Sequence, residues 1–226
     1  MTTTRWIRWV LKPALFTAAL VPVAYLIWAA LTGNLTANPI QELEHETGLW
    51  TLRFVCLTLA VTPLRRVTGW NSLIRFRRML GLYAFFYGTL HLLTYVVLDQ
   101  FFAFQTMLVD VTKRPYITVG FAGFVLMIPL AITSTAGMIR RLGGRRWNLL
   151  HRLIYVTAVA GVVHYWWLVK ADERSPERYA LAVGVLLGFR LLYLAWKSRS
   201  RLAPAPAAAG GRTPFRLDAE RDASLD

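Results

Sequence analysis

The sequence is poor in cysteine and in acidic residues, and it has no hydrophilic stretch of the size of a soluble domain. Its single cysteine, Cys56, excludes an internal disulfide and most thiolate metal sites, so we interpret it as a small buried hydrophobic residue. Twelve Asp and Glu stand against 26 Lys and Arg, giving a formal charge of +14. With 56% hydrophobic residues and a mean hydropathy of +0.42, the composition is typical of an integral membrane protein.

Six apolar stretches reach or approach the length of a membrane-spanning helix. A hydrocarbon core of roughly 30 Å needs about 20 helical residues. The first stretch follows Arg5, Arg8 and Lys12, as in a signal peptide, but it is too long and lacks a small-residue cleavage site, so we expect an anchor. The sequence therefore predicts an all-α polytopic membrane protein, with six transmembrane helices in a bundle at residues 9–31, 48–65, 78–98, 116–138, 148–169 and 179–196.

Positive charge is distributed unevenly among the segments between these spans. Eighteen Lys and Arg lie at the amino terminus, in residues 65–78 and 140–146, and from residue 197 onward, whereas five lie in the alternate segments. Short cytoplasmic loops retain Lys and Arg, so both termini are predicted to be cytoplasmic. We interpret the charge as orienting the chain and contacting anionic lipid, and it does not indicate nucleic-acid binding.

The segment after the last predicted span is short and rich in Ala, Pro and Gly. We predict a transmembrane domain at residues 1–198 and a disordered cytoplasmic tail at 199–226. Such a tail is too short for a flavin or nicotinamide domain, whose dinucleotide units need a βαβ motif. We therefore expect reducing equivalents to come from another molecule.

Three histidines within the spans carry the strongest functional signal, because an ionisable group in hydrocarbon is costly and usually functional. His151 and His164 lie thirteen residues apart on one predicted helix, and His91 lies in the span 78–98. By position, His91 and His164 both fall in the outer half and can face each other across one cofactor. His151 lies roughly 20 Å along the axis from His164, too far to share one metal ion. Paired axial imidazoles saturate haem iron and favour electron transfer over oxygen binding.

The inner position is incomplete. Fourteen residues before His91 the sequence has Arg77, which corresponds in depth to His151 as His91 corresponds to His164. The inner position could hold a second haem with an unusual or absent axial ligand, a different cofactor, or nothing. The competing interpretation of all three histidines is that they are hydrogen-bonded packing residues.

Other polar residues give weaker signals. His45 is predicted to be a solvated loop residue, and it fails the zinc-protease pattern because position 49 is leucine. Arg152 follows His151 and is the best candidate among the inner arginines to pair with a haem propionate, a flavin phosphate or an acidic donor. Arg53 and Arg190 lie within spans, where they could extend to an interface or pair with a propionate.

Several stretches carry a resemblance to a known family over nearly the whole chain up to about residue 197. They are TLAVTPLRR at 58–66, RRMLGLYAFFYGTLHLLTY at 77–95, TSTAGMIRRLGGRRWNLLHRLIY at 133–155 and VVHYWW at 162–167. With these stretches the chain resembles the haem-binding membrane subunits of bacterial periplasmic protein-methionine-sulfoxide reductase systems, a branch of the ferric-reductase-like transmembrane family.

The resemblance implies a function and a set of site residues. In the wider family two histidine pairs hold two haems; three of those positions match His91, His151 and His164, whereas the fourth is Arg77. It implies haem b, one or two per chain, with FMN as a further cofactor. It also implies an inner-membrane electron-transfer subunit, fed by the quinone pool or a cytoplasmic flavin reductase. The recipient would be a periplasmic molybdopterin-containing subunit, bound as a heterodimer, that catalyses reduction of methionine sulfoxide in damaged proteins.

Two other classes of function stay open on the sequence alone. A ferric or quinone reductase would use the same haem and need no periplasmic protein. A transporter or structural membrane protein would use the histidines for packing or protons, and it would purify colourless.

Overall fold

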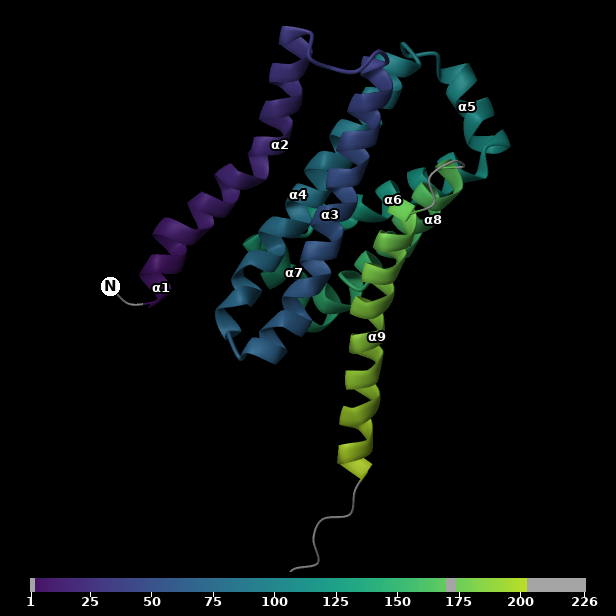
Figure 1. Ribbon diagram of the computed structural model, residues 1–226. Helices are drawn as coiled ribbons and strands as arrows, with labels where there is room; N and C mark the ends of the chain where they lie inside the picture. The colour runs from purple at the N-terminus through teal and green to yellow at the C-terminus, as the bar shows by residue number, and fades with distance from the viewer. Residues whose placement is uncertain (1–2, 170–173, 203–226) are drawn as a thin grey trace, which may run out of the picture. The chain divides into compact units, whose positions relative to one another are not determined.

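The computed structural model describes residues 3–169 and 174–202, and in these ranges the chain forms helices and no strands (Figure 1). The all-α fold class is thereby confirmed for the described part. The α-helices are α1 (Thr3–Trp6), α2 (Lys12–Thr32), α3 (Pro39–Thr68), α4 (Ile74–Leu93), α5 (Phe104–Lys113), α6 (Pro115–Ile132), α7 (Ala136–Leu150), α8 (Leu153–Leu168) and α9 (Arg174–Leu202). Two π-helical segments, η1 (Ile7–Leu11) and η3 (Thr94–Asp99), and one 3-10 turn, η2 (Asn71–Leu73), adjoin them.

Five helical stretches are long and apolar enough to cross a membrane. They are Ile7–Thr32, Pro39–Thr68, Asn71–Asp99, Pro115–Ile132 and Ser175–Arg199. Helix α8 is apolar but has only 16 residues, about 24 Å at 1.5 Å per residue. A multi-pass membrane protein is therefore supported by five of the six predicted spans, and the exposure of large apolar side chains such as Leu31 and Leu181 suits contact with lipid.

The predicted fourth span, 116–138, is too long at its carboxyl end. Helix α6 ends at Ile132, and the hydroxyls of Thr133 and Ser134 donate to the carbonyls of Pro129 and Leu130 (2.6 and 2.7 Å) where the chain turns. Thr135 then accepts a hydrogen bond from the Met138 amide and caps the start of α7.

The predicted fifth span, 148–169, begins too early. His151 is the residue that follows the last turn of α7, and α8 starts at Leu153. The prediction that His151 and His164 share one helix is therefore wrong. The break falls where Arg152 and the four arginines of α7 make the sequence too polar to continue an apolar helix.

Helices α3 and α4 pack side by side, as do α6 and α8 (Figure 1). Tyr87 of α4 lies at the centre of the core, fully buried, with its ring stacked on Phe54 of α3 at 5.3 Å. Its hydroxyl donates to the carbonyl of Ala19 (2.8 Å) and accepts from the amide of Val23 (3.2 Å), beside Pro22 in α2. Through these two hydrogen bonds Tyr87 connects backbone groups of α2 on either side of Pro22, which has no amide proton to donate. The same bonds attach α2 to α4.

The contacts divide the chain into two units, residues 1–190 and 191–226, and the packing described above belongs to the first. In the second, the described residues 191–202 form the last turns of α9. Helix α9 thus continues past residue 199, where the tail was predicted to begin, and residues 203–226 of that tail lie outside the described residues.

Candidate functional site

The structure brings His91 and His164 together. His91 lies in the last turn of α4 and His164 in α8, and their ring centroids are 6.1 Å apart with an interplanar angle of 72°. Two imidazoles on opposite sides of one metal ion, each bound through Nε2 at ~2 Å, have ring centroids about 6 Å apart. The spacing of this pair, which we call the outer pair, therefore fits axial ligation of one iron.

Each imidazole of the outer pair is held by a backbone carbonyl of a neighbouring helix. His91 Nδ1 lies 2.9 Å from the carbonyl of Glu44 in α3, and His164 Nδ1 lies 2.7 Å from the carbonyl of Tyr116 in α6. A carbonyl can only accept, so Nδ1 carries the proton and donates in both cases. Nε2 of each ring keeps its lone pair, which is the state that a metal ligand requires.

His151 lies in a different environment, which we call the inner site. Its ring stacks on Trp147 at 3.8 Å, and Nε2 lies 3.1 Å from the hydroxyl of Thr133. Because that hydroxyl already donates to the carbonyl of Pro129, it accepts from His151, so Nε2 carries the proton. The indole of Trp147 donates to the carbonyl of Thr133 (2.8 Å), which fixes the stacked ring in place.

The environment of His151 disfavours protonation of its ring, which would add a second positive charge near that of Arg77. His151 lies between α7 and α8, outside the candidate spans, and burial together with the positive charge of Arg77 lowers its pKa to about 4. The structure thus places Arg77 of α4 close enough to act on His151, in line with their matched depth in the sequence.

Arginines gather at the same end of the helices. Arg152, at the start of α8, is exposed, and with Arg66 and Arg77 it lies close enough for its charge to act on Arg190. The Arg190 guanidinium lies 4.6 Å from the ring centroid of Tyr155, a cation–π contact. This cluster could bind an anionic group, and Arg152 is its most accessible described member at the inner site.

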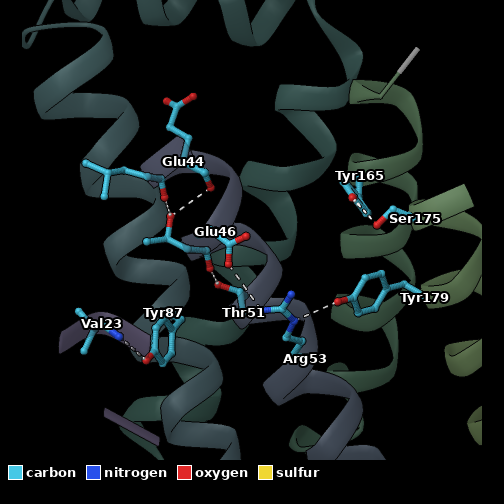
Figure 2. A network of polar contacts seen from close by, with 11 residues as sticks. Val23, Glu44, Glu46, Thr51, Arg53, Tyr87, Tyr165, Ser175 and Tyr179 are labelled. Atoms are coloured by element: carbon cyan, nitrogen blue, oxygen red, sulfur yellow. Dashed lines mark hydrogen bonds and ion pairs between the residues drawn. The ribbon is translucent and has the colours of Figure 1, made fainter. Parts of the chain in front are cut away.

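Arg53 has no described contact with the outer pair, whereas His45 lies close enough for its charge to act on His91 and has its ring centroid 6.0 Å from that of Tyr165. The guanidinium of Arg53 donates to the hydroxyl of Tyr179 (3.1 Å) and lies 3.6 Å from Glu46 (Figure 2). It also covers the ring of Trp50 at 4.4 Å. His45 is exposed as predicted, but it lies in α3, which begins at Pro39 with an Asn38 cap, and the prediction of a loop is wrong.

Sequence reasoning missed the groups that hold the imidazoles. These are the carbonyls of Glu44 and Tyr116, the hydroxyl of Thr133, and two glycines, Gly48 and Gly120, that back the rings of the outer pair. The available signal was a glycine inside an apolar helical run, which usually has a packing or functional reason. Among the described residues no group of three or more His, Cys, Asp or Glu is placed to hold a metal ion.

Residues 14–162 match the family described as ferric reductase like transmembrane component. The chain belongs to the ferric-reductase-like transmembrane family. The match includes His91 and His151 and ends just before His164.

Relatives of the chain carry a more specific name, "Protein-methionine-sulfoxide reductase heme-binding subunit MsrQ". The protein of that name from Herminiimonas arsenicoxydans is 55% identical over 193 residues, which cover 84% of this chain and 88% of that one. Its counterpart from Ralstonia nicotianae is 53% identical over 205 residues, 90% of this chain and 92% of that one. No solved structure matches the chain.

Proposed function

We propose that this chain is the haem-binding membrane subunit of a protein-methionine-sulfoxide reductase, with His91 and His164 as the two axial ligands of one haem b. The observation that carries the proposal is the outer pair: two imidazoles with centroids 6.1 Å apart and both Nδ1 atoms tied to carbonyls. The relatives named above as heme-binding subunits support it. A haem held by His91 and His164 would supply one-electron transfer.

The residues of the chain supply position and shielding. Donation from Nδ1 of His91 and His164 fixes each ring and raises the basicity of the Nε2 atom that faces iron. The apolar helices around the pair exclude water, and a low dielectric favours retention of neutral imidazoles. Catalysis on methionine sulfoxide is assigned to a separate subunit, and this chain acts as its electron-transfer partner.

The finer parts of the proposal follow from charge and from the relatives. We propose six spans, with α8 as the short fifth, and both termini in the cytoplasm of a bacterial cell, since Lys and Arg gather in alternate segments. We assign electron supply to quinol or a cytoplasmic flavin reductase, with FMN as a further cofactor. The periplasmic molybdopterin subunit is the proposed recipient. The inner site, with His151, Arg77 and Arg152, is assigned to a second, incompletely ligated haem or another anionic cofactor.

The reduced minus oxidised absorption spectrum of the purified protein tests the ligand assignment. Protein from haem-supplied cells should show a low-spin b-type signal, with haem per chain measured as the pyridine haemochrome. His91→Ala should abolish that signal, whereas His45→Ala, on an exposed histidine of α3 that neighbours His91 but is not a proposed ligand, should retain it. Absence of a Soret band from haem-replete wild type would rule the proposal out and leave a membrane protein whose histidines pack.

A second measurement separates the proposed role from direct reduction of ferric iron, the alternative function that the family description suggests. The reduced protein is mixed with a ferric chelate alone, or with the periplasmic reductase and methionine sulfoxide. Rapid reoxidation only in the mixture with the reductase supports the subunit role. Equally rapid reoxidation by the chelate alone would assign the chain to ferric reduction.

A further inference from the structure

The same local arrangement occurs twice at the outer pair, on two different helices. In α3 the carbonyl of Glu44 accepts from His91 Nδ1, and the residue four positions later is Gly48. In α6 the carbonyl of Tyr116 accepts from His164 Nδ1, and the residue four positions later is Gly120. Residues four apart lie one above the other on the same helix face, so each imidazole lies over its glycine to reach the carbonyl.

The space at both glycines is already taken by the rings. A Cβ on Gly120 would lie 2.6 Å from His164 Nδ1 and 2.9 Å from Cε1, which is closer than these atoms can approach. A Cβ on Gly48 would lie 3.2 Å from His91 Cε1 and 3.3 Å from Nδ1, a tight contact that demands a small displacement. Both glycines have ordinary helical backbones, so conformational freedom does not explain them.

We propose that Gly48 and Gly120 are positioning residues for the two haem ligands. By lacking a side chain they let each imidazole lie against its helix, donate from Nδ1 to the carbonyl one turn earlier and present Nε2 to iron. The inference rests on the proposed function for the haem itself. Its structural core, the glycine-dependent Nδ1 hydrogen bond, does not.

Two alanine variants and two matched controls test the proposal in the full chain. Gly120→Ala and Gly48→Ala place a methyl group against a ligand ring. In Gly81→Ala the nearest atom would be a Thr58 methyl carbon at 3.8 Å, and in Gly184→Ala no atom would lie within 4 Å. Alanine favours helix over glycine, so the controls should be at least as heat-stable as wild type.

The readouts are the ferric EPR spectrum, the midpoint potential and haem per chain. The Gly120→Ala variant should show the largest change, with a several-fold loss of haem or a displaced low-spin EPR signal. Gly48→Ala should show a smaller change in the same direction, and the controls should match wild type. If Gly120→Ala does not fold, Gly48→Ala decides. Wild-type EPR, potential and haem content in every folded variant of Gly48 and Gly120 would overturn the proposal.

Nitrogen NMR of histidine-labelled protein keeps this inference separate from the proposed function. The ¹⁵N shifts of the dithionite-reduced protein as purified report which ring nitrogen carries the proton, whether or not haem is bound. Protonated Nδ1 on His91 and His164 in wild type, lost selectively in the alanine variants, supports the positioning role. The same Nδ1 proton in Gly48→Ala and Gly120→Ala as in wild type would contradict it, even if the haem assignment holds.

Discussion

The outer pair and the inner site contain the same residue type but expose opposite ring nitrogens. His91 and His164 donate from Nδ1 to helix carbonyls and leave Nε2 available, whereas His151 donates from Nε2 to Thr133 and stacks on Trp147. In one case two partnered rings lie with their centroids 6.1 Å apart, and in the other a single ring lies close enough to Arg77 for that charge to act on it. Under the proposed function the outer pair is preorganised for iron, whereas the inner site must release a hydrogen bond before His151 can bind through Nε2.

Replacing the two histidines of α8 and its preceding turn gives the largest contrast. His164→Ala should abolish the low-spin b-type signal, because the remaining imidazole of His91 cannot saturate iron by itself. His151→Ala should retain that signal, since its ring makes no contact with the outer pair in the structure. Absorption spectra and haem per chain measure both. Loss of the low-spin signal in His151→Ala, with His164→Ala unaffected, would reverse the assignment of the two sites.

A variant that gains haem at the inner site would remove the difference between the inner site and the outer pair. Arg77→His supplies the missing partner, and Thr133→Val removes the hydroxyl that holds His151 Nε2. The double variant should bind about one haem per chain more than His151→Ala in the same background, with a second low-spin signal. Thr133→Val alone serves as the control for the lost hydrogen bond, which is worth about 1 kcal/mol. An unchanged haem count would show that the helices leave no room for a second porphyrin.

The contrast also marks how far the sequence predicts this site. Depth along two helices places His91 opposite His164 and Arg77 beside His151, because a helix rises by a fixed distance per residue. Haem ligation by these residues stays a prediction. The carbonyls of Glu44 and Tyr116 and the glycines above them depend on which helices become neighbours, and a single sequence does not specify that.

The sequence predicted most of the membrane-spanning helices, but it did not predict where two of them begin or end, or the short helix α5. Long apolar runs predicted six spans, and five of them correspond to helices long and apolar enough to cross a membrane, since a bilayer admits few alternatives to a helix. The boundaries at Thr133 and His151 were wrong because hydropathy does not register the side-chain hydrogen bonds made there. The hydroxyl of Thr133 and the indole of Trp147 donate to backbone carbonyls, and the ring of His151 bonds the Thr133 hydroxyl. The amphipathic helix α5 between two spans was missed because its apolar and polar residues alternate too closely for a hydropathy window.

Packing near the outer pair can be weakened without replacing either proposed haem ligand. Tyr87 lies four residues before His91, and its buried hydroxyl serves both a carbonyl and an amide of α2. Tyr87→Phe leaves both groups without that partner and should lower stability by about 1–3 kcal/mol. The haem spectrum should not change. Thermal unfolding in detergent measures the loss, with Tyr25→Phe, on an exposed tyrosine of α2, as the control. A shifted spectrum would show that the outer pair depends on how α2 is attached.

The smallest effect is expected at Arg53, which tests whether an arginine within a span belongs to the outer pair. Its guanidinium is held by Tyr179, Glu46 and Trp50, and about a third of the side chain is exposed. Exposed ion pairs contribute ~0.2–1 kcal/mol, so Arg53→Gln should lower thermal stability slightly, and less so in high salt. Lys12→Gln controls for the loss of one charge. The midpoint potential should equal that of wild type, because the guanidinium is already engaged by Tyr179, Glu46 and Trp50. A potential shifted in Arg53→Gln but not in Lys12→Gln would instead place Arg53 against the haem, as a partner for its propionate.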